Sequence, residues 1–134
     1  HKLLRHPDRK SVDQLLEVAP GVIRQITIAP ELPGALDAIS RFVDAGVPVA
    51  VGHTECDYDT AREAFARGAS LVTHAFNAMA PIQARLPGVL GAAVAADHVT
   101  IEVIADGIHV HPASIALLFA AAPGRNWEFG KFAA

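Results

Sequence analysis

Three histidines stand at or near the ends of short apolar segments in this chain. His53 and His74 belong to the segments 48–53 and 71–76, and His109 follows a third segment. Such short runs, rich in β-branched residues, are typical of buried strands. Parallel α/β folds place their functional groups at the carboxyl ends of strands, where neighbouring strands bring side chains together. We therefore expect His53 and His74 to face one site.

Two neutral imidazoles on adjacent strands are suitable ligands for a borderline divalent ion such as Zn²⁺, with a carboxylate to complete the set. An ion held in this way lowers the pKa of a bound water and polarises a bound carbonyl, as hydrolysis requires. The spacing leaves a second interpretation open, in which His53 and His74 only hydrogen-bond neighbouring loops. The chain contains 7 histidines, but histidine is also a common surface residue, so position is more informative than number.

Polar residues also follow the apolar segment 99–105. Asp106, Gly107 and His109 stand there within four positions of one another. Glycine allows the backbone to turn sharply or to approach a ligand closely. The side chains of Asp106 and His109 could therefore contact polar groups of a substrate. A solvated turn without a ligand is the alternative that these residues leave open.

The long loop 77–88 carries groups that could bind an anion. Asn77 and Ala78 begin this loop, and Arg85 lies near its end. Backbone N–H groups together with a guanidinium suit a phosphate or a carboxylate, although loops of this composition also occur without a ligand. Glu31 follows the first predicted strand, and we interpret it as a cap of the next helix rather than as a catalytic group.

The predicted elements alternate between strands and helices. Helices are expected over 33–45, from the capping residue Asp57 onward, and from Pro112. The first three strands begin at residues 25, 48 and 71, so that each strand–helix unit takes 23 residues. This spacing suits parallel strands joined by crossover helices. Four strands are predicted, at 25–30, 48–53, 71–76 and 99–105.

The fold class predicted from these elements is α/β. The strands are apolar on both faces, which indicates a parallel sheet with helices covering both of its sides. The rhythm is compatible with a flavodoxin-like open sheet or with part of a (β/α)₈ TIM-type barrel. A complete barrel needs about 250 residues, whereas this chain has 134. On the barrel interpretation the chain forms about half of a barrel, with residues 1–124 as the partial domain and 125–134 as an atypical tail.

The composition narrows the classes of function. Hydrophobic residues make up 51% of the chain and charged residues 19%, which suits a folded core. The net charge of -3 and the lack of a basic patch argue against a nucleic-acid partner. The apolar stretch 114–122 is too short to cross a bilayer, and no signal segment is recognised, so no membrane partner is expected. Cys56 is the single cysteine, which excludes an internal disulfide and favours a reducing, cytoplasmic setting.

Several motifs together resemble a known family. The pair T-H-x-F-N-A-M and A-D-G-x-H is specific when both occur at this separation. The motifs are T-I-A-P-E at 27–31, V-G-H-T at 51–54, T-H-A-F-N-A-M at 73–79, R-L-P-G at 85–88 and I-A-D-G-I-H-V at 104–110. With them the chain resembles the N-acetylglucosamine-6-phosphate deacetylases over roughly residues 1 to 124.

The resemblance implies a metal-dependent amidohydrolase with a (β/α)₈ barrel. Enzymes of this family remove the acetyl group of N-acetylglucosamine 6-phosphate and use a divalent metal, commonly zinc or iron. His53 and His74 match the metal-binding histidines. His109 matches a histidine beside the acetyl carbonyl, where it would stabilise the developing oxyanion, and Arg85 matches a phosphate-binding arginine that family dimers can supply across their interface. The residues that match substrate contacts are Asn77, Ala78, Arg85, Asp106, Gly107 and His109.

The sequence also departs from the family. An H-x-E-G-P motif with the metal-binding glutamate and a T-D-A motif with the general-base aspartate are absent. We therefore expect little catalysis by this chain alone. Half a barrel leaves open strand edges and apolar helix faces, so we expect it to form a homo-oligomer or to join a complementary piece. A non-catalytic α/β module that binds a sugar phosphate or only assembles is the alternative. A cyclic-amide hydrolase is disfavoured, because the N-A-M loop with Arg85 suits a phosphate.

Overall fold

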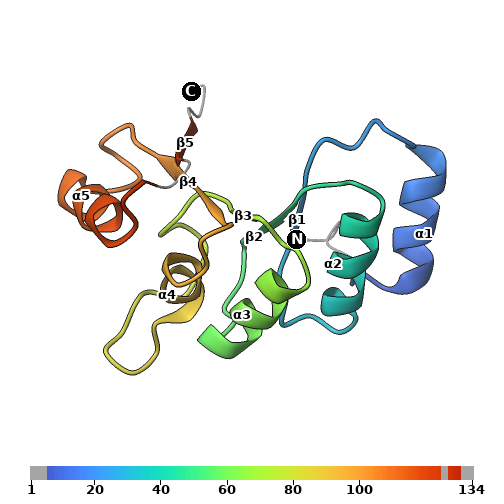
Figure 1. The fold of residues 1–134 in the computed structure, drawn as a ribbon, viewed down its shortest axis with the longest axis horizontal. Helices are drawn as coiled ribbons and strands as arrows, with labels where there is room; N and C mark the ends of the chain where they lie inside the picture. Colours follow the sequence, from blue (N-terminus) through green and yellow to red (C-terminus); the bar gives the residue numbers. More distant parts are fainter. Residues whose placement is uncertain (1–5, 125–126, 131–134) are drawn as a thin grey trace.

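The computed structural model describes residues 6–124 and 127–130 of the chain. It contains one parallel sheet of five strands with helices between them (Figure 1). The strands are β1 (Ile26–Ile28), β2 (Val49–Val51), β3 (Leu71–Val72), β4 (Thr100–Ile104) and β5 (Trp127–Gly130). The helices are α1 (Arg9–Val18), α2 (Ala35–Asp44), α3 (Tyr58–Ala66), α4 (Gly88–Val94) and α5 (Pro112–Ala121).

The order of the strands decides between the two predicted architectures. Each strand pairs in parallel with the next one along the chain, in the order β1-β2-β3-β4-β5. A doubly wound sheet reverses its strand order at a switch point, and no reversal occurs among the described strands. The sheet therefore follows barrel order, and the prediction of an α/β partial barrel is confirmed.

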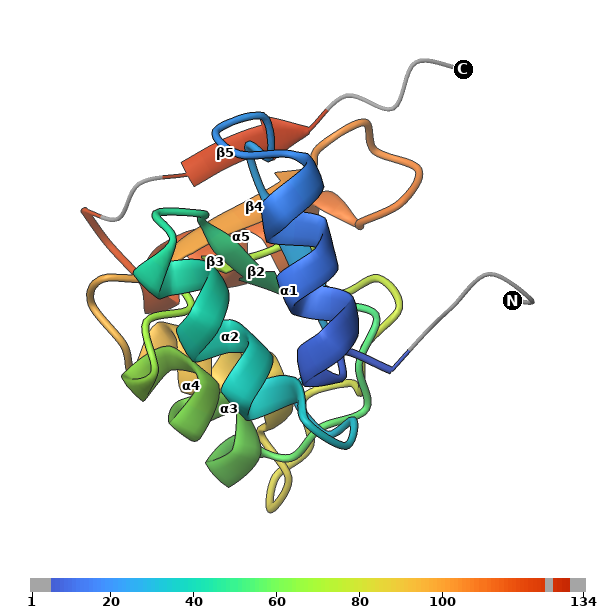
Figure 2. The same ribbon diagram turned by 90° about the vertical axis from the view of Figure 1, so that its right-hand side faces the viewer.

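Helices cover one face of this sheet, not two. Val12, Ile39, Phe65, Leu90 and Leu118 come from α1 to α5 in turn, and all five belong to one buried cluster. Figure 2 shows α1 to α4 side by side along the sheet. The expectation of helices on both faces was wrong, because right-handed crossovers between strands in sequential order place every helix on the same side.

The register explains how strands apolar throughout can carry helices on one side only. One row across the sheet contributes side chains to the core under the helices, and the preceding row faces the opposite side. The core row is Ile28, Val51, Val72 and Ile101. The opposite row is Thr27, Ala50, Leu71 and Thr100, none of which joins the helix-side cluster.

Three elements were not expected from the sequence. α1 and α4 lie in segments without a recognised helical pattern, and β5 lies within the predicted tail, where it pairs with β4. β3 is shorter than the predicted 71–76, because His74 and Phe76 have positive φ angles that leave the extended conformation. The division of the chain at residue 125 stays a prediction, and residues 125–126 and 131–134 of the tail lie outside the described part.

The helix boundaries follow local capping chemistry. The side chain of Asp57 accepts a hydrogen bond from the backbone N–H of Thr60 at 2.8 Å, as predicted for an N-cap. α5 begins at Pro112, also as predicted, and His111 caps it by accepting from the backbone N–H of Ala113 at 3.1 Å. These two caps set where α3 and α5 start.

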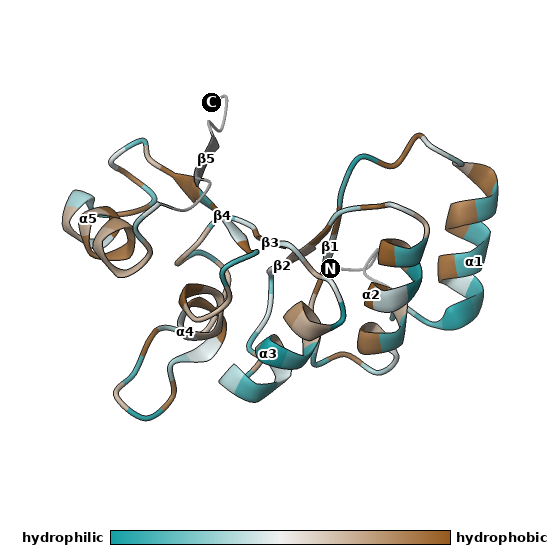
Figure 3. Ribbon diagram, viewed as in Figure 1, coloured by the Kyte–Doolittle hydropathy of each residue, from teal (hydrophilic) through white to brown (hydrophobic). Residues whose placement is uncertain are grey.

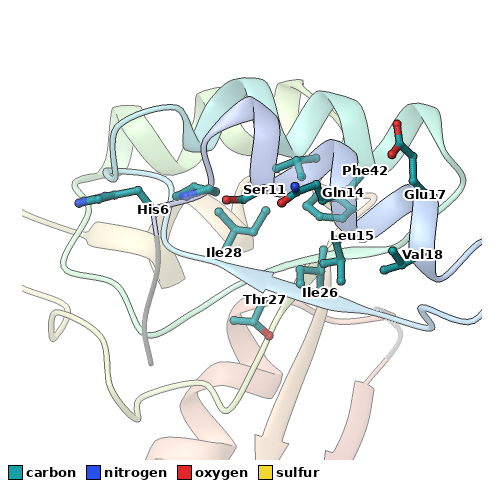
Figure 4. A pocket seen from close by; sticks show the side chains of 12 residues that line it. His6, Ser11, Gln14, Leu15, Glu17, Val18, Ile26, Thr27, Ile28 and Phe42 are labelled. Atoms are coloured by element: carbon teal, nitrogen blue, oxygen red, sulfur yellow. The ribbon is translucent and has the colours of Figure 1, made fainter. Parts of the chain in front are cut away.

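Apolar surface remains exposed at both ends of the row of strands, next to α1 and on α5. A pocket of about 850 Å³ lies between α1 and β1, with Leu15, Val18 and Ile26 among its lining side chains (Figure 4). At the opposite end of the sheet, α5 is apolar around most of its circumference, and Leu117 is 72% exposed (Figure 3). No helix within the described part of the chain is long and apolar enough to span a membrane.

Candidate metal and substrate site

The two predicted metal ligands meet beyond the ends of neighbouring strands. His53 follows β2 and His74 follows β3, and their Nε2 atoms are 2.9 Å apart. The two rings stand edge to face, with centroids 4.4 Å apart and an interplanar angle of 87°. His53 is exposed and His74 is half-buried, so the pair opens to solvent on one side. The sequence-based expectation that both rings face one site agrees with this geometry.

A backbone carbonyl orients the ring of His74. Its Nδ1 lies 2.9 Å from the carbonyl oxygen of Asn77, which can only accept, so Nδ1 carries the proton. In the neutral ring Nε2 then keeps its lone pair. Metal-binding histidines commonly donate their second ring N–H to a carbonyl or carboxylate in this way. His74 is thus prepared to offer Nε2 as a ligand.

The distance between the two Nε2 atoms is suitable for a shared ion. Two nitrogens that each lie about 2.05 Å from a tetrahedral ion are about 3.3 Å apart, so the observed 2.9 Å needs only a small separation of the rings. In residues 6–124 no group of three or more histidine, cysteine, aspartate or glutamate side chains is placed to hold a metal. The described residues of this chain therefore bring together two candidate ligands, His53 and His74.

Left-handed backbone is concentrated around this pair. The non-glycine residues with positive φ among those described are His53 (51°), His74 (37°), Phe76 (73°) and Ala78 (49°). Residues other than glycine rarely adopt this backbone conformation, and each instance costs about 1–3 kcal/mol. Such strain persists where surrounding contacts enforce it, and it is enriched at functional sites. The loops after β2 and β3 thus hold the two imidazoles at an energetic cost.

Gly52 makes room for the histidine pair. A Cβ atom at this position would lie 2.4 Å from Cγ2 of Thr73 and 3.6 Å from Cε1 of His74. The first distance is far below an ordinary van der Waals contact of about 3.5–4.0 Å. A side chain at residue 52 would therefore collide with Thr73, just before the two histidines, unless Thr73 moved.

Glu31 connects the end of β1 to the loop after β2. Its carboxylate accepts a hydrogen bond from the hydroxyl of Thr54 and another from the backbone N–H of Glu55, the latter at 2.9 Å. The interpretation of Glu31 as a helix cap was wrong, because α2 begins after Gly34 and has no side-chain cap. The carboxylate instead fixes the residues that directly follow the first histidine.

Thr54 extends this connection to the loop after β3. It is only 2% exposed, its backbone N–H donates to the carbonyl of Ala78 at 3.0 Å, and it forms a parallel bridge with Met79. Its hydroxyl oxygen also accepts from the backbone N–H of Cys56 at 3.1 Å. The ends of three consecutive strands are therefore joined through one buried residue, by its side chain to Glu31 and by its backbone to Ala78.

A second pair of predicted residues meets beyond β4. The Asp106 carboxylate accepts hydrogen bonds from the backbone N–H groups of Ile108 at 2.8 Å and His109 at 2.9 Å. Its other oxygen lies 2.7 Å from Nδ1 of His109. These bonds, with that from the His109 backbone first, lower the pKa of Asp106 to about 2. Gly107 has a φ of 78°, as the tight turn requires.

The remaining predicted residues lie along the loop after β3. Asn77 turns its side chain back on its own loop, where Nδ2 donates to the carbonyl of Ala75 at 3.2 Å. Ala78 is exposed. Arg85 is exposed too, and it lines a hollow of about 350 Å³ beside the start of α3, which neither His53 nor His74 lines. The structure thus groups His53 with His74 and Asp106 with His109, while Arg85 lies in a separate hollow.

Sequence reasoning missed two residues that support the site. Gly52 was read only as part of a strand, although a glycine directly before a candidate ligand can signal a close approach of two strands. The role of Thr54 depends on Glu31 and Met79, residues distant in sequence, so no local pattern could have revealed it.

Two curated relatives of this chain are deacetylases of N-acetylated amino-sugar phosphates. The chain is 46% identical to an N-acetylglucosamine-6-phosphate deacetylase from Vibrio furnissii over 106 residues, which cover 78% of the chain and 24% of the relative. It is 37% identical to an N-acetylgalactosamine-6-phosphate deacetylase from Escherichia coli O157:H7 over 116 residues, 87% of the chain and 31% of that relative. No family model matches the chain.

A solved structure agrees with these relatives. It is that of a point mutant of N-acetyl-D-glucosamine-6-phosphate deacetylase from Mycobacterium smegmatis, in complex with N-acetyl-D-glucosamine-6-phosphate. The two proteins are 43% identical, with a TM-score of 0.92 over 96% of this chain and 34% of the other. The chain thus spans about a quarter to a third of the proteins that it matches.

Proposed function

This chain belongs to the N-acetylglucosamine-6-phosphate deacetylase family over the stretch that it covers, and we propose that it carries part of the metal and substrate site of such an enzyme. The proposed reaction is hydrolysis of the acetamide of an amino-sugar 6-phosphate to the free amine and acetate. The observation that supports this most directly is the 2.9 Å approach of the two imidazole Nε2 atoms beyond β2 and β3.

His53 and His74 are the proposed ligands of a divalent ion, with zinc or iron as the candidates. The donor set suits such an ion, because both ligands are imidazoles and one is already oriented by the carbonyl of Asn77. When bound, the ion would supply a water of lowered pKa and polarise the acetyl carbonyl. The remaining steps concern groups of this chain that bind and orient the substrate.

His109 is the proposed contact to the acetyl carbonyl. A donor at this position stabilises the negative charge that develops on the oxygen when water attacks an amide. In this role the imidazolium form of the ring would donate from Nε2, because Nδ1–H already faces Asp106. Asp106 and Gly107 shape the same loop.

Asn77, Ala78 and Arg85 are the proposed contacts to the sugar phosphate. Binding of the phosphate would hold the amide in place from a distance, so that binding energy away from the reacting bond orients the scissile group. Arg85 does not share a hollow with the histidine pair, which suits delivery of its guanidinium to a neighbouring subunit. A homo-oligomer, in a cytoplasmic setting, is therefore part of the proposal.

The proposal also includes limited activity of this chain by itself. Among residues 6–124 no carboxylate joins the two histidines in a metal-binding group. The family's metal-binding glutamate and general-base aspartate stand in motifs that this sequence does not contain. Without a general base, activation of the water would be inefficient.

Metal binding and hydrolysis test the proposal separately. Zinc titration by calorimetry should show binding to the chain, loss of binding in a His53→Ala/His74→Ala double variant, and no change in the control variant His6→Ala, whose ring is exposed and remote from β2 and β3 in sequence. Acetate release from the N-acetylglucosamine and N-acetylgalactosamine 6-phosphates should be detectable with a full-length form and at least a hundredfold lower with this chain.

Two results would contradict the proposal. If neither form releases acetate from either sugar phosphate, the hydrolase assignment is wrong. If the double variant binds zinc as the unchanged chain does, the two histidines are not the ligands. A chain that binds the sugar phosphate but no metal would instead support the alternative of a non-catalytic binding module.

A further inference from the structure

The Asp106 carboxylate is engaged within its own loop. Both oxygens receive donors: one oxygen accepts from two consecutive backbone N–H groups, at Ile108 and His109, and the other faces Nδ1 of the His109 ring at 2.7 Å. Asp106 and His109 are three positions apart in the sequence, and one tight turn brings their side chains within ion-pair distance. A carboxylate used in this way has little capacity left for a substrate hydroxyl or amide.

We propose that Asp106 is a positioning residue, which fixes the His109 ring with Nδ1–H toward the carboxylate and thereby makes Nε2 the ring atom presented to the substrate. This inference rests on the proposed function for the role of His109, but the arrangement of the ring itself does not depend on it. On this inference Asp106 does not make the substrate contact that the sequence predicted but acts through the His109 ring.

The chemistry of the two partners supports a single tautomer. An ionised carboxylate can only accept, so the ring nitrogen that faces it must carry a proton. The pKa of Asp106 is lowered to about 2, chiefly by the backbone N–H groups, so the carboxylate is ionised at any working pH. Nε2 then accepts a hydrogen bond when the ring is neutral and donates one when the ring is protonated.

The turn fixes the orientation as well as the tautomer. Gly107 has a φ of 78°, a conformation that glycine adopts at little cost, and it directs the chain back so that His109 lies over Asp106. The buried Val110 follows directly and is 4% exposed, so the loop is anchored to the core just beyond the histidine. The imidazole is therefore held from its backbone, from Nδ1 and from the next residue.

An Asp106→Asn variant separates positioning of the ring from shaping of the loop. The amide oxygen can still accept from both backbone N–H groups, which keeps the turn. The amide nitrogen then faces Nδ1 of His109, and since it can only donate, it favours a ring protonated at Nε2. An Asp106→Ala variant loses both functions.

The test is the tautomer of His109, read by long-range ¹H–¹⁵N correlation spectra of this chain labelled at histidine. Spectra are recorded at about pH 9, above the usual histidine pKa of about 6.5, without metal or substrate. The His109 signals are assigned by their absence in a His109→Ala variant. Asp57→Asn is the matched control, because Asp57 also accepts a backbone N–H at an exposed position, as the N-cap of α3, and its hydrogen-bond partner is Thr60 and not a histidine.

The expected result is an Nδ1–H ring in the unchanged chain and in Asp57→Asn, and an Nε2–H ring in Asp106→Asn, with the amide shifts of Ile108 and His109 retained in that variant. An unchanged tautomer in Asp106→Asn overturns the inference. Loss of the loop amide shifts in Asp106→Asn to the same extent as in Asp106→Ala also overturns it, because the carboxylate would then only shape the loop. Since no turnover is measured, a failure of the deacetylase assignment would leave this result readable.

Discussion

Replacement of Gly52 by alanine tests how closely β2 and β3 must approach to pair the two histidines. The added Cβ would lie 2.4 Å from Cγ2 of Thr73, about 1 Å inside an ordinary contact. The same Cβ would make only ordinary contacts with Cγ2 of Thr27 at 3.4 Å and with Cε1 of His74 at 3.6 Å, so the conflict is with Thr73, which must move. We expect the two strand ends to separate by several tenths of an ångström or more.

The expected magnitude follows from what packing and metal sites tolerate. Overpacking of a close-packed region costs about 1–3 kcal/mol of stability. Metal sites tolerate ligand displacements of about 0.2 Å, so a shift of the strand ends well beyond the roughly 0.4 Å that takes the two Nε2 atoms from 2.9 Å to about 3.3 Å would misplace the ligands. Gly52→Ala should therefore lower the free energy of unfolding by about 1–3 kcal/mol and weaken zinc binding at least tenfold, which corresponds to about 1.4 kcal/mol.

The assays are urea denaturation and zinc titration of the same preparations. Gly91→Ala is a matched control, because its Cβ would also lie 2.4 Å from a neighbouring atom, Cβ of Pro87, but on α4 and not beside either histidine. The control should change stability without changing zinc affinity. If Gly52→Ala binds zinc as tightly as the unchanged chain, the close approach of β2 and β3 is not what positions the imidazoles.

Three further outcomes are expected. Glu31→Ala leaves the buried Thr54 hydroxyl and a backbone N–H without their acceptor, so urea denaturation should show a free energy of unfolding lower by about 1–3 kcal/mol. The control Glu55→Ala should be near neutral. Equal effects of the two variants would refute the connection between Glu31 and Thr54. Burial raises the pKa of the Cys56 thiol to about 11, so the thiol stays protonated at pH 8 and iodoacetamide should modify it about a hundredfold more slowly in the folded chain than in urea; equal rates would refute this. Light scattering should give a mass above the 14.1 kDa of one chain, because Val18 and Leu117 are more than 70% exposed, and a monodisperse monomer would count against association.

Patterns local in sequence could be predicted well. The strands around Ile28, Val51 and Ile101 are short β-branched runs, and their spacing implied parallel pairing. Asp57 and Pro112 marked helix starts because capping depends on residues one to three positions away. His53 and His74 could be paired for a different reason, because neighbouring parallel strands end at the same edge of the sheet.

Features that depend on contacts between distant residues could not be predicted. The role of Glu31 became apparent only when β1 and β2 were placed side by side, because its partners are Thr54 and Glu55. Helices on one face follow from the order of the strands, which periodicity does not report. α4 was missed because its sequence is rich in small residues, and glycine lowers helix propensity.

The residues with positive φ around the histidine pair affect the motion of the loops after β2 and β3, which together form the rim of the site. His53, His74 and Ala78 each store conformational energy that would be released if their loops opened. Opening of the rim is therefore easier than melting of the strands below it, and amide protons there should exchange before those of the sheet. An ion bound to both rings would oppose this opening by mass action. Metal binding should therefore slow amide exchange in the loops after β2 and β3 and leave the exchange of the sheet unchanged.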